Sequence, residues 1–206
     1  MLETVKRIYR KLVGAKPYIS QPNKEEVLVD YEVKRKVLND YRLQYQLDVF
    51  VETGTFLGDT IHFFKDRFSR LYSIELSEEL AARAVKRFAA DSNVTIIQGD
   101  SGRVFETLIP SIKEPALFWL DGHYSSEFFH DGEYIVTAKA ELNTPVEKEL
   151  DILLNSPHKN VILIDDARLF VGAVDYPTID AIQKKVASHP YKMKVENDMI
   201  QITPVN

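Results

Sequence analysis

Short apolar runs alternate with stretches of helical periodicity between residues 48 and 188. Short apolar runs bounded by turn residues are typical of buried strands, and we predict strands at 49–52, 71–74, 94–97, 117–120 and 161–164. Apolar residues at helical spacing predict helices at 59–68, 77–90, 102–109, 144–154 and 178–188. Strands that alternate with helices indicate a parallel sheet with right-handed crossovers.

The two ends of the chain depart from this alternation. Residues 2–13 and 24–45 show amphipathic helical patterns, and 191–196 and 199–203 flank Asn197-Asp198 as the strands of a hairpin would. We therefore expect an α/β fold, a three-layer α/β/α sandwich around a mostly parallel, Rossmann-like seven-stranded sheet with an antiparallel C-terminal hairpin. Residues 1–46 would form an N-terminal helical extension, and 47–206 the Rossmann-like domain.

Local signals refine two places in this scheme. Ser77 is a good N-cap for its helix, and Thr144 with Glu147 forms a capping box that has Pro145 at the first helical position. The segment 124–143 is long for a connection between a strand and its helix, so we predict a lid that shapes a binding pocket, with 133–142 as a short extra helix.

Composition excludes several classes of protein. The 206 residues include no cysteine, which removes disulfides, thiolate metal sites and cysteine nucleophiles. The formal net charge of −5 argues against a protein whose main role is to bind nucleic acid. No apolar run approaches the roughly 20 residues of a membrane span, and the N-terminus lacks the pattern of a signal peptide. We expect a cytoplasmic protein that binds no membrane.

Acidic residues follow every strand of the predicted parallel sheet. In open α/β sheets, ligands bind beyond the carboxyl ends of the strands. The residues found there are Glu52, Glu75, Asp100, Asp121 and the pair Asp165-Asp166. One such acid is unremarkable, because helix N-termini favour carboxylates. Acids after all five strands favour a ligand rich in hydroxyl and amino groups, a cationic ligand or a metal ion.

The turn after the first strand distinguishes between two nucleotide cofactors. Gly54 and Gly58 permit a tight turn and a close approach of the backbone to a ligand. A dinucleotide fingerprint would need G-x-G-x-x-G with an acid about 20 residues further on. Glu75 fits that spacing, but the middle glycine is missing, and Glu52 would lie close to the pyrophosphate. The sequence therefore disfavours NAD.

From about residue 48 to its end, the chain resembles the class I S-adenosylmethionine-dependent methyltransferases. The stretch Val51-Glu52-Thr53-Gly54-Thr55-Phe56-Leu57-Gly58 is similar to the first motif of that family in its looser E-x-G-x-x-x-G form. The resemblance implies that Glu75 receives the ribose hydroxyls and that Asp100 lies beside the adenine amino group. The cofactor-binding residues that it implies are Glu52, Gly54, Thr55, Gly58, Thr60, Glu75, Asp100, Ser101 and Asp121.

Two further stretches resemble the metal-dependent O-methyltransferases that modify sugars in macrolide and aminocoumarin antibiotic pathways. They are Leu120-Asp121-Gly122-His123-Tyr124 and Ile164-Asp165-Asp166. The resemblance implies that Asp121, Asp165 and Asp166 hold Mg²⁺, which would bind the hydroxyl of a small-molecule acceptor and lower its pKa. That subfamily has an acid as general base where this chain has His123, so His123 and Asp121 are the predicted catalytic residues. His123 could equally be a fourth metal ligand.

Several alternatives remain open at this stage. Asp121, His123, Asp165 and Asp166 could serve a metal-dependent hydrolase, although Glu75 and Asp100 would then have no role. A non-catalytic cofactor-binding module is a third possibility. The Asp165-Asp166 pair could equally cap a helix. Lys34, Arg35 and Lys36 fit a solvated helix face, and Arg168 fits a salt bridge. The apolar faces of the two N-terminal helices offer a surface for a homodimer.

Overall fold

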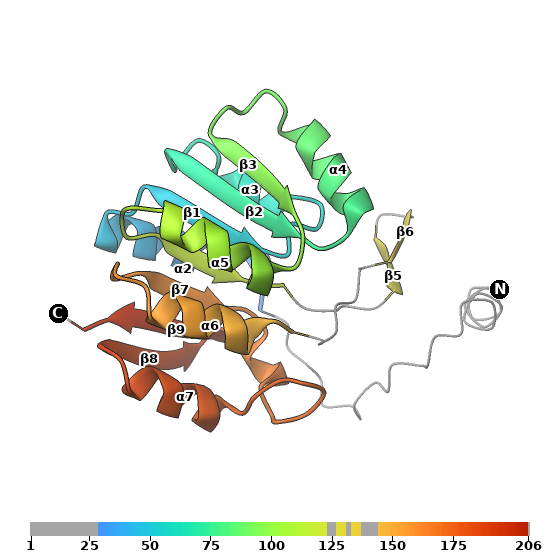
Figure 1. The fold of residues 1–206 in the computed structure, drawn as a ribbon. Helices are drawn as coiled ribbons and strands as arrows, with labels where there is room; N and C mark the ends of the chain where they lie inside the picture. Colours follow the sequence, from blue (N-terminus) through green and yellow to red (C-terminus); the bar gives the residue numbers. More distant parts are fainter. Residues whose placement is uncertain (1–28, 123–126, 131–132, 137–143, 206) are drawn as a thin grey trace, which may run out of the picture.

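The predicted sandwich is confirmed by a computed structural model, which describes residues 29–122, 127–130, 133–136 and 144–205 (Figure 1). Its main sheet has seven strands in the order β3-β2-β1-β4-β7-β9-β8. The strands are β1 (Val49–Thr53), β2 (Arg70–Glu75), β3 (Val94–Gln98), β4 (Leu117–Leu120), β7 (Val161–Ile164), β8 (Tyr191–Glu196) and β9 (Met199–Pro204). The first five pair in parallel, whereas β9 runs antiparallel to β7 and to β8, as the predicted C-terminal hairpin requires.

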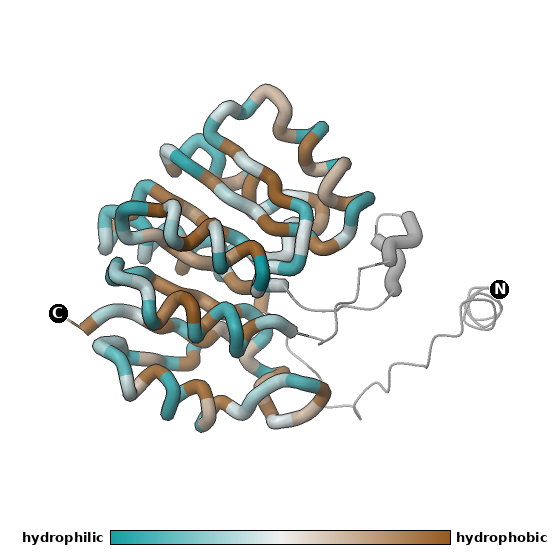
Figure 2. The backbone as a smooth tube through the Cα atoms, in the orientation of Figure 1, coloured by the Kyte–Doolittle hydropathy of each residue, from teal (hydrophilic) through white to brown (hydrophobic). Residues whose placement is uncertain are grey.

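The central strands β1 and β4 are buried on both faces because helices cover both faces of the sheet. In β1, Val49 and Val51 belong to one hydrophobic core and Phe50 to the other, and β4 divides in the same way between Phe118 and Trp119. This alternation follows from the two-residue period of a strand. The hydropathy colouring shows the same arrangement, with apolar strands enclosed by helices whose outer positions are polar (Figure 2).

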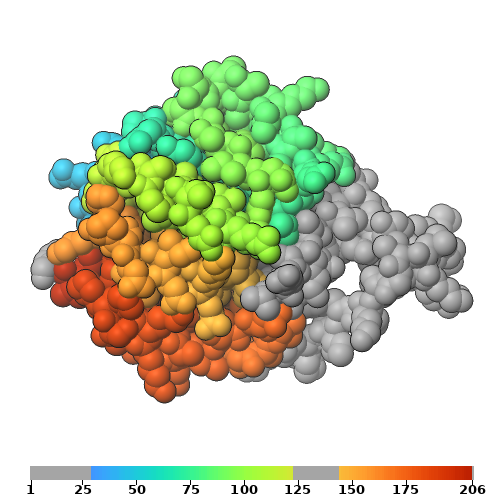
Figure 3. Space-filling view, viewed as in Figure 1, coloured from blue at the N-terminus to red at the C-terminus, as the bar shows by residue number. Residues whose placement is uncertain are grey.

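The helices divide evenly between the two faces. Residues of α5, α6 and α7 pack in one core, and residues of α2, α3 and α4 pack in the other. Helices α5 and α6 lie side by side on the face seen in Figure 3. The bounds are α2 (Tyr31–Tyr45), α3 (Asp59–Phe64), α4 (Glu78–Arg87), α5 (Ser101–Ser111), α6 (Val146–Leu154) and α7 (Ile179–Ala187), with a short 3₁₀ helix η1 (Ala167–Leu169) after β7.

Some predicted helix bounds are wrong. Helix α2 begins at Tyr31 rather than at residue 24, because the Asp30 carboxylate accepts a hydrogen bond from the Glu32 backbone and caps it there; residues 24–28 and the predicted helix 2–13 lie outside the described residues. Helix α3 ends at Phe64 instead of residue 68. Ser77 caps α4 as predicted.

The predicted capping box of α6 is wrong in its detail. The helix starts at Val146, and Pro145 is its N-cap rather than its first residue. The Thr144 hydroxyl still accepts a hydrogen bond from the Val146 backbone N–H, at 3.3 Å. Thr144 therefore lies one residue before the N-cap, whereas in a capping box it would be the N-cap itself.

The extra helix predicted at 133–142 is wrong over residues 133–136, and the rest of it lies outside the described residues. A second, two-stranded sheet pairs β5 (Glu127–His130) with β6 (Glu133–Val136) in antiparallel register. The sequence supports this hairpin, since aromatic and β-branched residues flank Asp131-Gly132, a strong turn signal. The hairpin lies beyond the carboxyl ends of the parallel strands (Figure 1). The predicted lid falls partly outside the described residues and stays a prediction.

The strand order reverses direction between β1 and β4. Strands β2 and β3 are added on one side of β1, and β4 and β7 on the other. In such sheets this switch point opens a crevice at the carboxyl ends, which is the usual place for a ligand. Among the described residues, no helix combines the length and apolar character that a bilayer crossing needs.

Candidate functional site

The turn that joins β1 to α3 lies at this switch point and is packed against β4. Gly54 and Gly58 have φ angles of 85° and 82°. A Cβ atom on Gly54 would lie 2.5 Å from the carbonyl oxygen of Asp121, so the two backbones approach each other more closely than any side chain would allow. Phe56, between the glycines, has a φ of 49°, which is unusual for a bulky residue. The predicted glycine turn therefore forms where a ligand of this fold binds.

Glu52 lies beneath this turn and is almost completely buried. Its Oε2 accepts a hydrogen bond of 2.6 Å from the Ser73 hydroxyl, which is also 2.6 Å from the Thr55 hydroxyl. Thr60 also hydrogen-bonds to Glu52, and burial raises the pKa of the Glu52 carboxyl to about 8. The side chains of Thr55 and Thr60 are buried as well. Three residues predicted to contact the cofactor thus join a buried network that supports the turn.

Glu75 ends β2 and connects this strand to the turn. One carboxylate oxygen accepts the backbone N–H of Phe56 at 2.8 Å, and the other accepts that of Ser77 at 2.9 Å. Burial raises the pKa of the Glu75 carboxyl, against the opposing effect of these hydrogen bonds. A carboxylate has about four acceptor sites, and the backbone N–H groups of Phe56, Ser77 and Leu76 occupy three of them. Glu75 can therefore stabilise the strained Phe56 backbone and still accept a hydrogen bond from a hydroxyl group of a ligand.

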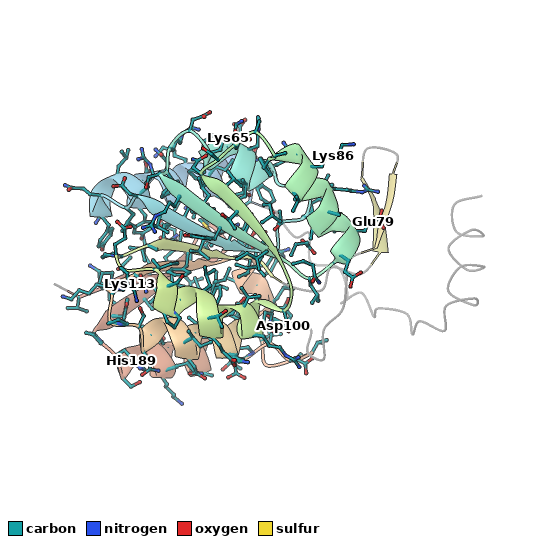
Figure 4. The ribbon with its side chains drawn as sticks, turned by 45° about the horizontal axis from the view of Figure 1, so that its top comes forward. Lys65, Glu79, Lys86, Asp100, Lys113 and His189 are labelled. Carbon is teal, nitrogen blue, oxygen red and sulfur yellow. The ribbon has the colours of Figure 1, made fainter. Side chains whose placement is uncertain are left out.

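Asp100 follows β3 and caps α5. Its Oδ1 accepts the backbone N–H of Arg103 at 3.0 Å, while the side chain stays partly exposed. Asp100 lies at the N-terminal end of α5, at the opposite end from Lys113 (Figure 4). Ser101 is buried beside it. Asp100 thus combines the ordinary capping role with a second carboxylate oxygen that remains for a ligand.

Asp121 follows β4 and contacts helix α2. Its backbone N–H donates to the Thr53 carbonyl at 3.1 Å, and its Oδ2 accepts the Tyr31 hydroxyl at 3.1 Å. The negative charge of Asp121 raises the pKa of the Tyr31 phenol, which stays protonated at neutral pH. Tyr31 was not among the predicted site residues. The next predicted residue, His123, lies outside the described residues.

The prediction that Lys34 is solvated is wrong. Lys34 is only 4% exposed, and its Nζ lies 2.5 Å from Asp165 Oδ1 and 3.7 Å from Asp166 Oδ1. Burial raises the pKa of the Asp165 carboxyl to about 7, with the charges of Asp121 and Asp166 adding to the rise and Lys34 opposing it. Arg168 forms the predicted salt bridge, since its Nη1 lies 2.7 Å from Asp166 Oδ1 and also pairs with Asp198.

This arrangement does not fit the predicted magnesium ion. Mg²⁺ needs oxygen ligands at about 2.0–2.1 Å in octahedral geometry. Within the part of the chain that the structure describes, no three His, Cys, Asp or Glu side chains gather closely enough to hold a metal ion. The Lys34 ammonium lies against Asp165, and Arg168 lies against Asp166. The two aspartates do face cations, but these cations belong to the chain itself.

Sequence analysis missed Glu149, which is the most deeply buried acid of this region. Glu149 is 1% exposed, and burial raises the pKa of its carboxyl to about 7 against a hydrogen bond from Ser101. Among the described residues, its Oε1 meets no hydrogen-bond partner. It lines a pocket between β4, β7 and α6, together with Asp121, Gly122, Thr144, Asp165 and Tyr176. Helical spacing from Val146 and Leu153 places Glu149 on the apolar face, and this signal could have revealed it.

Known structures share this fold over nearly the whole chain. The O-methyltransferase TomG of Streptomyces achromogenes, solved with S-adenosylmethionine, has a TM-score of 0.59 at 14% identity over 98% of this chain and 96% of its own. A putative O-methyltransferase from Klebsiella pneumoniae has a TM-score of 0.58 at 13% identity, over 98% of this chain and 96% of its own. An O-methyltransferase from Bacillus cereus, solved with SAH, has a TM-score of 0.56 at 17% identity, over 100% of this chain and 90% of its own.

No family model and no curated protein sequence matches the chain. At identities below a fifth, the structural likeness establishes the fold and not the reaction. The resemblance expected from the sequence is thus confirmed for the architecture: the chain has the fold of class I S-adenosylmethionine-dependent methyltransferases.

Proposed function

We propose that this protein is an S-adenosylmethionine-dependent methyltransferase that acts on a hydroxyl oxygen of a small molecule. One observation carries the proposal. The glycine turn after β1 is packed on the Asp121 carbonyl at the switch point, with acids at the ends of the neighbouring strands. Neutral adenosine and a cationic sulfonium suit such an acidic site, whereas a pyrophosphate does not.

Each described acid has a distinct role in this proposal. Glu75 receives the ribose hydroxyls, for which its carboxylate retains an acceptor site, and Asp100 uses its uncapped oxygen for the adenine amino group. Glu52 supports the turn from below, and Asp121 lies where the sulfonium end is expected. When bound, the cofactor supplies an electrophilic methyl group. The protein then contributes mainly the alignment of the acceptor oxygen with that group.

We place the acceptor next to Asp121, which lines the small pocket between β4, β7 and α6. We assign His123, which follows Asp121 and Gly122 in the chain, the role of the base that takes the proton of the acceptor hydroxyl, because a histidine titrates near neutral pH. Two further predictions remain. The protein would form a homodimer through its N-terminal helices, for which α2 offers the exposed Val33 and Leu43, and it would be cytoplasmic.

The proposal includes no metal step. The set of oxygen ligands that Mg²⁺ requires is not available, because Asp165 and Asp166 are engaged by Lys34 and Arg168. In this protein the proton transfer and the alignment therefore depend on side chains of the chain itself.

Binding and turnover test the proposed function. We expect S-adenosylhomocysteine to bind at micromolar concentration in calorimetry and to raise the melting temperature, while NAD does neither. With S-adenosylmethionine and a panel of sugars, phenols and simple alcohols, S-adenosylhomocysteine should form with at least one acceptor. His123→Ala should bind S-adenosylhomocysteine as the wild type does and turn over at least tenfold more slowly. Failure of the wild type to bind either sulfur compound would refute the proposal.

Asp100→Asn separates cofactor binding from helix capping. Asparagine caps helices about as well as aspartate, so the free energy of unfolding should change by less than about 0.5 kcal/mol. The charge that faces the adenine amino group is lost, so the affinity for S-adenosylhomocysteine should fall about tenfold. Calorimetry and urea unfolding measure the two effects. An unchanged affinity would remove Asp100 from the cofactor site.

A further inference from the structure

We propose that the ammonium of Lys34 is the permanent cation of this site and stands where the resemblance to metal-dependent enzymes would put a divalent metal. The inference rests on the proposed function for its meaning, because it concerns how the acids beside the acceptor pocket are balanced. Lys34 acts through Asp165 and is therefore a positioning residue. The consequence is a methyltransferase site that takes up no Mg²⁺.

The burial of the ion pair is the first observation. Side-chain exposure is 5% for Lys34 and 3% for Asp165, and Nζ lies 2.5 Å from Oδ1. A charged group removed from water is costly unless an opposite charge pairs with it. The same Oδ1 atom of Asp165 also accepts the backbone N–H of Asp166 at 2.8 Å. Lys34 is thus built into the interior and is not a surface lysine that happens to lie near an acid.

The geometry of α2 is the second observation. Tyr31 and Lys34 are three residues apart and share one face of the helix. Tyr31 donates to Asp121 Oδ2 at 3.1 Å, and the Lys34 Nζ lies 5.3 Å from the centre of the Tyr31 ring. One turn of α2 therefore supplies a proton donor to Asp121 and a cation to Asp165. These are two of the three acids assigned to Mg²⁺ by resemblance.

Asp166, the third acid that the resemblance assigns to Mg²⁺, also lies beside positive charges of the chain. Arg168 lies 2.7 Å from Asp166, and Lys34 lies 3.7 Å from it. A divalent ion placed among these carboxylates would meet the ammonium at close range, where like charges repel strongly in a buried site. Lys34 would have to withdraw before a metal could bind. Ammonium and metal are therefore alternatives at this position.

Metal binding, measured without turnover, tests the inference. We would titrate Mn²⁺ into the wild type and into Lys34→Ala, with free Mn²⁺ followed by electron paramagnetic resonance and thermal unfolding recorded in parallel. The wild type should show no stoichiometric site below 1 mM and no change in melting temperature. Lys34→Ala should be destabilised, gain one Mn²⁺ site and recover part of its stability on Mn²⁺ addition. A further Asp165→Asn change should abolish the gained site.

Two further variants serve as matched controls. Lys34→Arg keeps the charge and should bind no Mn²⁺, even if Lys34→Ala fails to fold. Lys36→Ala removes an exposed lysine on the same helix, which pairs with Asp40, and should behave as the wild type. A stoichiometric Mn²⁺ site in the wild type, or none in a folded Lys34→Ala, overturns the inference. Because no step needs S-adenosylmethionine, failure of the proposed function would appear separately, in the cofactor-binding experiment.

Discussion

Gly54→Ala is expected to abolish measurable S-adenosylhomocysteine binding and to lower the free energy of unfolding by about 2–4 kcal/mol. The added Cβ would lie 2.5 Å from the Asp121 carbonyl oxygen, and the residue would have to adopt a φ of 85°. Neither backbone can yield without parting β1 from β4 at the switch point. Calorimetric titration and urea unfolding measure the two losses.

Gly172→Ala is the matched control for this prediction. Gly172 has a φ of 79°, so alanine there carries a comparable backbone strain, but its Cβ would meet the Thr178 methyl group and, among the described residues, no backbone atom. This variant should lose stability and still bind S-adenosylhomocysteine. If Gly54→Ala bound the compound with wild-type affinity, the turn after β1 would not be the cofactor site.

The unliganded protein is expected to lose several kcal/mol of stability as the pH rises from 5 to 8. Glu52 has its pKa raised from 4.5 to about 8, and Glu149 from 4.5 to about 7. Between the unfolded and folded pKa values, the folded state binds more protons, so the free energy of unfolding falls with rising pH. Each pKa unit corresponds to about 1.4 kcal/mol. Urea unfolding at pH 5 and pH 8 measures the difference.

Glu52→Gln should remove a large part of this pH dependence. The amide keeps the shape of the carboxyl and has no proton to lose, so the difference in stability between pH 5 and pH 8 should shrink by about 2 kcal/mol or more. Glu106→Gln is the control, because Lys148 lowers the pKa of the Glu106 carboxyl and the fall in stability should persist. A pH dependence that Glu52→Gln leaves intact would contradict the assignment.

The fold could be predicted because its signals are local. Each buried strand is a short apolar run, and the pairing of β1 with both β2 and β4 follows from the ordinary rules for crossovers. The acids at the strand ends could be located for the same reason. The hairpin β5–β6 was missed although Asp131-Gly132 signalled it, because the helical interpretation gave too little weight to the aromatic residues on either side.

The cation of the site could not be predicted from local patterns. Lys34 and Asp165 are 131 residues apart, and the sequence of α2 does not reveal which of its faces meets the sheet or how far it reaches toward the strand ends. Neighbouring basic residues at 34–36 are ordinarily solvated. The packing of Leu38, four residues after Lys34, into the core places Lys34 on the buried face of the helix.

Helix α2 also contacts segments of the chain that are synthesised much later than the helix itself. Tyr41 donates to Gln201 of β9 at 2.8 Å, so the helix that carries Tyr31 and Lys34 is fastened to the final strand of the sheet as well as to the loop after β7. Contacts across such separations carry a large loop-closure entropy and form late. During synthesis, the acids at 165 and 166 can meet their lysine only after the ribosome has released more than 130 further residues beyond Lys34, because Lys34 and Asp165 are 131 residues apart.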